Sequence, residues 1–162
     1  MPKISADSFL ARSVRKMATN PTFRKVAPKI LPPIDRAVHR VSKGRFSVSG
    51  ALVPSLVLIT TGAKSAQRRE SPLACVPEGD SAWYVVGSNF GREKHPAWTA
   101  NLIANPEAAI DFGRRNIDVT ASLLTDEEKA EVWPRLLAVW PAYADYVEVS
   151  GRNLRVFRLA TR

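Results

Sequence analysis

The chain has 162 residues, of which 45% are apolar and 24% are charged, and this composition is typical of one soluble domain with a single hydrophobic core. No apolar stretch is long enough to cross a bilayer, and no signal-peptide core follows the N-terminus, so we expect a cytoplasmic protein. Cys75 is the only cysteine, which excludes an internal disulfide bond. No set of cysteines and histidines has the spacing of metal ligands, so we expect no metal site.

The net charge of +9 is concentrated in residues 1–50, which hold eleven Lys and Arg residues against two Asp residues. Apolar stripes in this stretch predict helices over residues 6–18 and 33–42. We therefore divide the chain into a basic helical arm, residues 1–45, and a body, residues 46–162. The arm could contact an anionic membrane surface or pack on the body as a helical cap. Nucleic-acid binding is disfavoured, because the arm lacks interleaved aromatic residues and any known binding module.

Short apolar and β-branched runs separated by turn residues dominate the body and predict strands. The predicted strands are residues 55–61, 70–76, 82–88, 108–112, 116–124 and 153–159, the fourth and fifth forming a hairpin around Gly113-Arg114. The predicted helices are residues 96–104, residues 126–140 after a capping box at Thr125 and Glu128 with a kink or break at Pro134, and residues 141–149. Many short strands with few helices between them favour an α+β fold, namely a small, mostly antiparallel barrel with peripheral helices.

The usual catalytic motifs are missing, since the sequence contains no nucleophile elbow, no Gly-rich dinucleotide or phosphate loop and no His-Glu-x-x-His. An enzyme with this sequence would therefore depend on a bound cofactor. Two segments have the residue types of an anion site. Residues 60–69 combine a glycine turn and hydroxyl groups with Lys64, Arg68 and Arg69, and residues 87–98 lead from a strand through a polar turn into a helix N-terminus. Each segment taken alone is also compatible with an ordinary solvated loop.

Four motifs appear in a fixed order along the chain. They are Thr60-Thr61-Gly62-x-Lys64-Ser65 with Arg69-x-x-Pro72-Leu73, then Ser88-Asn89 followed by Lys94-His95-Pro96-Ala97-Trp98, then Asn101-Leu102-x-Ala104-Asn105-Pro106, and finally Trp133-Pro134-x-Leu136 followed by Pro141-x-Tyr143-x-x-Tyr146. In this order and spacing, the body resembles the deazaflavin (coenzyme F420)-dependent nitroreductase family over roughly residues 40–159. The resemblance implies a split β-barrel of the FMN-binding type. It also implies an oxidoreductase that passes hydride from reduced F420 to a small organic acceptor such as a nitro compound, a quinone or an enone.

The resemblance assigns the site residues by position. For cofactor binding it implies Ala63, Lys64, Ser65 and Arg69 at the phosphate and acidic tail, Val86, Gly87, Ser88 and Asn89 beside the ring, and Ala97, Trp98 and Asn101 along the cleft. As catalytic residues it implies Ser88, Tyr143 and Tyr146. The sequence departs from the family pattern at Ala63, where arginine is usual, and at Ala66, where glycine is usual.

Two alternatives remain open from the sequence. The first is the same barrel with FMN as its cofactor. The second is a non-catalytic protein that binds a cofactor or a lipid and associates with the membrane through residues 1–45. In either case the barrel could pair as a homodimer, because split barrels often complete their site in this way. Three tryptophans, Trp83, Trp133 and Trp140, are predicted to be core residues.

Overall fold

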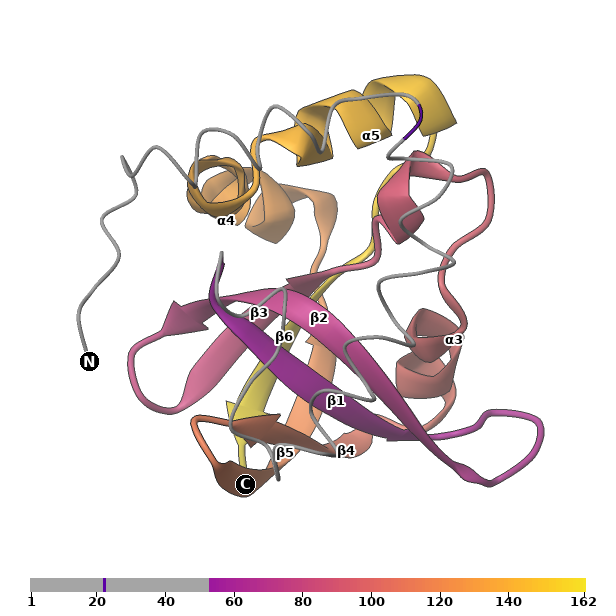
Figure 1. Cartoon of the computed structure of the whole chain (residues 1–162), viewed down its shortest axis with the longest axis vertical. Helices are drawn as coiled ribbons and strands as arrows, with labels where there is room; N and C mark the ends of the chain where they lie inside the picture. The colour runs from indigo at the N-terminus through magenta and orange to yellow at the C-terminus, as the bar shows by residue number, and fades with distance from the viewer. Residues whose placement is uncertain (1–21, 23–52) are drawn as a thin grey trace.

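A computed structural model describes residue 22 and residues 53–162 of the chain. The body forms a closed antiparallel barrel of six strands in the order β1-β2-β3-β6-β5-β4 (Figure 1). The strands are β1 (Ser55–Thr61), β2 (Arg68–Glu78), β3 (Ala82–Val86), β4 (Glu107–Phe112), β5 (Arg115–Leu123) and β6 (Val156–Thr161). The expected α+β barrel is therefore confirmed. The helices expected over residues 6–18 and 33–42, and the boundary between residues 45 and 46, lie outside the described residues.

The barrel closes through a short contact between β1 and β4. Residues 57–59 of β1 pair with residues 109–111 of β4, and the strands separate on either side of this contact. Every other neighbouring pair shares at least four residue pairs in register. The barrel is thus least tightly joined along one edge, which is the edge beside the first cationic segment.

Two hydrophobic clusters lie on the two sides of the barrel wall. Consecutive residues of β3 alternate between them, with Trp83 and Val85 in the barrel interior and Tyr84 and Val86 on the outside against α4 and α5. Both sets are buried because helices cover this outer face, and a strand covered on both sides is apolar throughout. The prediction of Trp83 as a core residue is confirmed, since its side chain is 1% exposed.

Within residues 53–162, three α-helices flank the barrel, α3 (Ala97–Ala104) on one side and α4 (Asp126–Val139) with α5 (Ala142–Ser150) across one end (Figure 1). The predicted capping box is present, because the Glu128 amide donates to Thr125 Oγ1 at 3.2 Å and the Thr125 amide donates to Glu128 Oε2 at 2.8 Å. Of the kink or break predicted at Pro134, the break is wrong, since α4 runs continuously through this residue.

The predicted strands differ from the structure mainly at their ends. Strand β2 is longer than expected and runs from Arg68 to Glu78. Strand β6 starts at Val156 instead of residue 153, because Arg152 and Asn153 make side-chain contacts to other segments and only Leu154 turns inward. Strand β3 ends at Val86, where Gly87 begins the turn to the 3₁₀ helix η1 (Asn89–Gly91). Among the described residues, no helix combines the length and the hydropathy that a membrane span requires.

Candidate functional site

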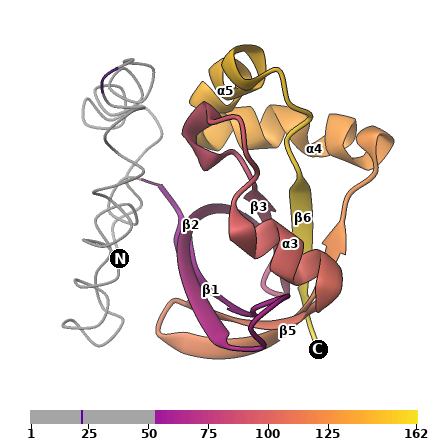
Figure 2. The same ribbon diagram turned by 90° about the vertical axis from the view of Figure 1, so that its right-hand side faces the viewer.

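The two cationic segments of the sequence form loops on the same side of the barrel. The β1–β2 loop, residues 62–67, projects beyond the ends of its two strands, and the β3–α3 loop, residues 87–96, contains η1 and leads into α3. Helix α3 lies between the two loops and packs along β1 (Figure 2). The chain thus brings together two segments that are separated by about twenty residues in sequence.

The β1–β2 loop is a tight turn closed by its own backbone. The Gly62 amide donates to Gln67 O and the Ala66 amide donates to Gly62 O, both at 2.8 Å. A Cβ on Gly62 would lie 2.5 Å from Ser65 Oγ and 3.3 Å from Gln67 O, so a larger residue there would force the exposed Ser65 side chain to rotate. Ala66 has a φ of 54°, which is a left-handed conformation that glycine adopts without strain. This conformation is the physical reason for the glycine that is usual at this position.

The cations of the β1–β2 loop face solvent. Lys64, Ser65 and Arg69 are all exposed. Arg69, at the start of β2, donates from Nη2 to Gln67 Oε1 at 3.1 Å and lies 3.5 Å from Ser65 Oγ, so both contacts are made to the adjoining loop. Arg68 pairs with Glu70 at 3.1 Å, whereas among the described residues neither Lys64 nor Arg69 has a carboxylate partner. These two cations therefore remain available to an anionic ligand.

Asn101 joins the β1–β2 loop to α3. Its Nδ2 donates to Thr60 Oγ1 and its Oδ1 accepts from the Ala63 amide, each at 3.0 Å. The Asn101 side chain is 8% exposed and Thr60 is 2% exposed, so both bonds are shielded from water. The structure therefore places Asn101 as the support of the loop, and it occupies the Ala63 amide that could otherwise face a phosphate.

The β3–α3 loop has a strained backbone held by internal contacts. Asn89 and Phe90 have φ values of 46° and 54°, and two successive left-handed residues of this kind cost on the order of 1–3 kcal/mol each. Asn89 Nδ2 donates to Lys94 O at 2.8 Å, which folds the loop back on itself. The Ser88 hydroxyl does not cap η1.

Gly87 brings this loop close to the start of α3. Its amide donates to Arg155 O at 2.8 Å, and a Cβ at this position would lie 2.7 Å from the Thr99 methyl group. A larger residue would push the loop away from the helix. The glycine thus fixes where the Ser88 hydroxyl lies relative to α3.

Two of the residues assigned to cofactor binding direct their side chains elsewhere. Trp98 is 6% exposed and packs inside the barrel, 5.7 Å from the Phe157 ring, while Val86 is 7% exposed and packs in the outer cluster. Of the two assigned residues at the start of α3, Ala97 is exposed and Trp98 is buried. Val86 and Trp98 therefore shape the site through the backbone and through packing.

An aromatic row links α4, α5 and the β3–α3 loop. The ring of Tyr143 lies 6.4 Å from Trp133 and 6.4 Å from Tyr146, and the Tyr146 ring lies 6.4 Å from Phe90. Both tyrosines are buried, at 5% and 1% exposed. Burial, with smaller contributions from Tyr146 and Cys75, raises the pKa of Tyr143 well above its usual range, so its hydroxyl stays protonated.

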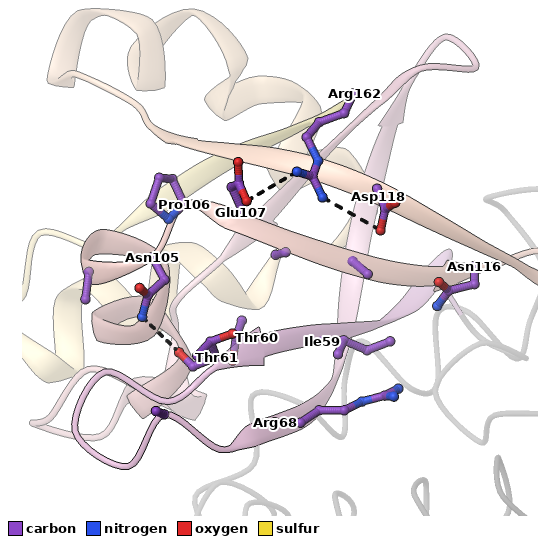
Figure 3. Close-up of a pocket in the computed structure, with 14 residues that line it drawn as sticks. Ile59, Thr60, Thr61, Arg68, Asn105, Pro106, Glu107, Asn116, Asp118 and Arg162 are labelled. Carbon is purple, nitrogen blue, oxygen red and sulfur yellow. Dashed lines mark hydrogen bonds and ion pairs between the residues drawn. The ribbon is translucent and has the colours of Figure 1, made fainter.

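A groove of about 680 Å³ opens where β1 and β4 separate, and the charged side chains at its rim already form ion pairs (Figure 3). Arg162 lies 3.3 Å from Glu107 and 3.9 Å from Asp118, and Arg68 pairs with Glu70. The groove is lined by Ile59, Thr60, Thr61, Ala66, Arg68, Ala104, Asn105, Pro106, Glu107, Ala108, Ala109, Asn116, Asp118 and Arg162. This paired rim distinguishes the groove from Lys64 and Arg69, which have no carboxylate partner within residues 53–162.

Metal and thiol chemistry find no support in the part of the chain that the structure describes. Within it, no three His, Cys, Asp or Glu side chains are grouped as metal ligands. Burial raises the pKa of Cys75 to about 12, so the thiol is protonated at neutral pH and is a poor nucleophile.

The sequence motifs include Thr60 without giving it a role of its own, and they do not include Arg152. Arg152 contacts the β3–α3 loop from a position about sixty residues later in the chain, and Thr60 anchors Asn101. Neither residue stands out in the sequence, because a lone arginine after a helix and a threonine at the end of a strand are both common.

Comparison with known proteins places this geometry in a family. The family model described as F420H(2)-dependent quinone reductase matches residues 34–160. An F420H(2)-dependent quinone reductase of Mycobacterium tuberculosis (strain H37Rv) is 39% identical over 101 residues, which cover 60% of this chain and 66% of that relative, just under two thirds of its length.

Two solved structures share the architecture. A structure named F420-H2 dependent reductase (FDR-A) is 36% identical with a TM-score of 0.60, over 65% of this chain and 93% of that one. A structure described as a domain-swapped dimer is 31% identical with a TM-score of 0.61, over 78% of this chain and 98% of that one. Together with the family match, these likenesses confirm the resemblance seen in the sequence motifs. The chain belongs to the F420H(2)-dependent quinone reductase family.

Proposed function

We propose that this chain is an oxidoreductase that uses reduced coenzyme F420 to convert a quinone to its hydroquinone. The observation that carries the proposal is the β1–β2 loop, where Lys64 and Arg69 lack carboxylate partners within residues 53–162 and Asn101 ties the loop to α3. An anionic cofactor suits this donor set, because lysine and arginine form charge-assisted hydrogen bonds with phosphate and carboxylate groups. The quinone is proposed as acceptor because the curated relative is named for it.

The residues assigned to the two loops would contact different parts of the coenzyme. Lys64, Ser65 and Arg69 would hold the phosphate and the acidic tail, with Ala63 adding only its small side chain beside them. The turn from Val86 to Asn89 would contact the ring, and Ala97, Trp98 and Asn101 would support the cleft from α3. When bound, the reduced coenzyme supplies the hydride.

The reaction requires a place for negative charge on the acceptor. A quinone that gains a hydride and a proton becomes a hydroquinone, and charge develops on one of its oxygens during the transfer. The Ser88 hydroxyl, which does not cap η1, would donate a hydrogen bond to this oxygen. Tyr143 and Tyr146 would form the neutral, apolar side of the acceptor pocket, since burial keeps the Tyr143 hydroxyl protonated.

Binding of F420 tests the assignment of the first loop. We would titrate the protein with oxidised F420, following deazaflavin fluorescence, with FMN in parallel. The double variant Lys64→Gln/Arg69→Gln should bind F420 about 10- to 100-fold more weakly, because two charge-assisted contacts of about 1 kcal/mol each at an exposed loop are removed. The control is Arg114→Gln/Arg115→Gln, which removes two exposed cations at the distant β4–β5 turn. An affinity equal to that of the wild type in the first variant would refute the phosphate assignment.

Turnover tests the second loop. With menadione as the quinone, Ser88→Ala should lower kcat about 10-fold or more while the F420 affinity stays within about twofold, since one hydrogen bond to the developing charge is lost. Tyr143→Phe should change the Michaelis constant for the quinone more than the F420 affinity. If neither kinetic parameter changes in either variant, the acceptor pocket lies elsewhere.

Two further features are part of the proposal. We propose that the barrel forms a homodimer, which is supported by the relative described as a domain-swapped dimer. We also propose that the basic arm, residues 1–45, contacts an anionic membrane surface, supported by its excess of cations. Light scattering of the purified protein tests the first, and sedimentation with phosphatidylglycerol vesicles at low and high salt tests the second.

A further inference from the structure

We propose that Arg152 is a positioning residue for the β3–α3 loop, and that it holds the Gly87–Asn89 turn in the geometry that hydride transfer requires. This inference rests on the proposed function, which places the cofactor ring and the acceptor at that turn. It concerns a residue outside both loops, in the segment that joins α5 to β6.

The guanidinium of Arg152 contacts both ends of the loop at once. Its Nη2 donates to Ser88 O at 2.7 Å, and its Nη1 lies 3.5 Å from Gly87 O. Its Nε donates to Arg92 O at 2.8 Å, on the far side of η1. The planar fork of arginine can satisfy several acceptors in fixed directions, which the single ammonium group of lysine cannot do.

The loop needs a support in addition to its internal contacts because its backbone is strained. Helix η1 is only three residues long, and its middle residue, Phe90, has a non-helical left-handed conformation. Strained backbone of this kind persists only where the surroundings determine it. Arg152 supplies a link between the entry of the turn at Ser88 and its exit at Arg92, so the position of the Ser88 hydroxyl depends on it.

Arg152 also connects the loop to the aromatic row. It follows Gly151, which ends α5 with a φ of 60°, so the direction of the arginine is set by the end of this helix. The same helix carries Tyr146, whose ring contacts Phe90 of η1 at 6.4 Å. The hydrogen bonds of Arg152 and the ring contact between Tyr146 and Phe90 therefore hold the loop against the end of α5.

The surroundings of Arg152 favour this role over an ion pair. Among the described residues no carboxylate pairs with it, and its Nη1 lies 2.9 Å from His95 Nδ1. His95 must then present an unprotonated Nδ1. Burial, followed by the nearby Arg155 and Arg152, lowers the pKa of His95, which keeps the ring in this acceptor form. His95 therefore reports on the presence of the arginine.

The experiment compares Arg152→Gln and Arg152→Lys with the control Arg158→Gln. Arg158 is also a partly exposed arginine of the C-terminal segment, but it pairs with Glu78 on the barrel wall and does not contact the loop. For each variant we would measure the thermal midpoint, the F420 dissociation constant, kcat and the Michaelis constant with menadione, and the His95 titration by NMR. A His39→Gln background leaves His95 as the only histidine.

We expect Arg152→Gln to lower kcat at least 10-fold with a smaller change in the quinone Michaelis constant, and to raise the pKa of His95. Arg152→Lys should restore only part of kcat, since lysine retains the charge without the fork. Arg158→Gln should leave kcat, F420 affinity and the His95 titration unchanged even where the thermal midpoint falls. A purely structural role is the alternative, and it is indicated if Arg152→Gln lowers the midpoint without affecting kcat or His95, which would overturn the proposal.

Failure of the proposed function would look different. If the wild-type protein neither binds F420 nor reduces menadione, the proposed function fails. In that case the His95 titration still tests the contact between Arg152 and the loop, because it needs no cofactor. An unchanged His95 titration in Arg152→Gln would overturn the positioning role regardless of activity.

Discussion

Replacing Asn101 by alanine should loosen the β1–β2 loop and destabilise the fold. The change removes the bond from Asn101 Nδ2 to Thr60 Oγ1 and the bond from the Ala63 amide to Asn101 Oδ1, each 3.0 Å long and formed by a side chain that is 8% exposed. A net contribution of about 1 kcal/mol for each bond predicts a loss of about 2 kcal/mol in the free energy of unfolding. For a domain of this size that corresponds to a fall of about 4–8 °C in Tm.

In the Asn101→Ala variant, ligand binding would also have to order the loosened β1–β2 loop. If the ordering costs about 1–2 kcal/mol, the F420 dissociation constant of Asn101→Ala should rise about 5- to 30-fold. This effect would occur although the Asn101 side chain is occupied by Thr60 and Ala63. Together with the loss of stability, this weaker binding distinguishes a residue that supports the loop from a residue that contacts F420 directly.

The assay is urea unfolding followed by tryptophan fluorescence, together with the F420 titration. Asn105→Ala is the matched control, because this asparagine lies one turn further along and makes a single exposed contact of 3.4 Å to Thr61 O. It should cost about 0.5 kcal/mol or less. Thr60→Val combined with Asn101→Ala in a double-mutant cycle should show a coupling of about 1 kcal/mol. Equal urea midpoints for Asn101→Ala and the wild type, at equal slope, would refute the reasoning.

Three further changes test other parts of the fold. Ala66→Gly should leave the free energy of unfolding unchanged or raise it by up to about 1 kcal/mol, because it relieves a left-handed alanine with a φ of 54°. The control Ala130→Gly, on the exposed face of α4, should lower it by about 1 kcal/mol, and urea unfolding measures both. Thr125→Ala should cost about 1 kcal/mol by removing the capping box, and a loss no larger than that of Ser122→Ala would contradict this role. The folded state lowers the pKa of His95 below its ordinary value of 6.5, so the unfolded state binds the proton more tightly; stability should be fully present above about pH 6.5 and decline as the pH falls through the folded-state value. His95→Gln should flatten this decline in unfolding curves measured across that range, and an equally steep decline in the variant would show that another group is responsible.

Local sequence patterns were sufficient for the elements and for the residue types of the site. The β-branched run before Gly62 predicted β1, and the Thr125–Glu128 pair predicted the start of α4, because strand propensity and helix capping depend on neighbours only a few residues away. The cations of residues 60–69 indicated an anionic ligand on the same local grounds. Pro134 shows the limit of such reasoning, since the packing of α4 outweighs the preference of proline for a break.

The roles of individual side chains were decided by the tertiary structure. Asn101 and Trp98 belong to consecutive motifs of the sequence and lie about one turn apart on α3. One supports the β1–β2 loop and the other fills the barrel, because each turn of the helix meets different neighbours once it packs on a curved sheet. Arg152 reaches the β3–α3 loop only because β6 pairs with β3 and brings the chain back beside Gly87. The sequence thus determined which chemical groups are present and which elements carry them. Barrel closure determined which groups meet, since contacts between distant segments depend on strand order and register that no short stretch of sequence specifies.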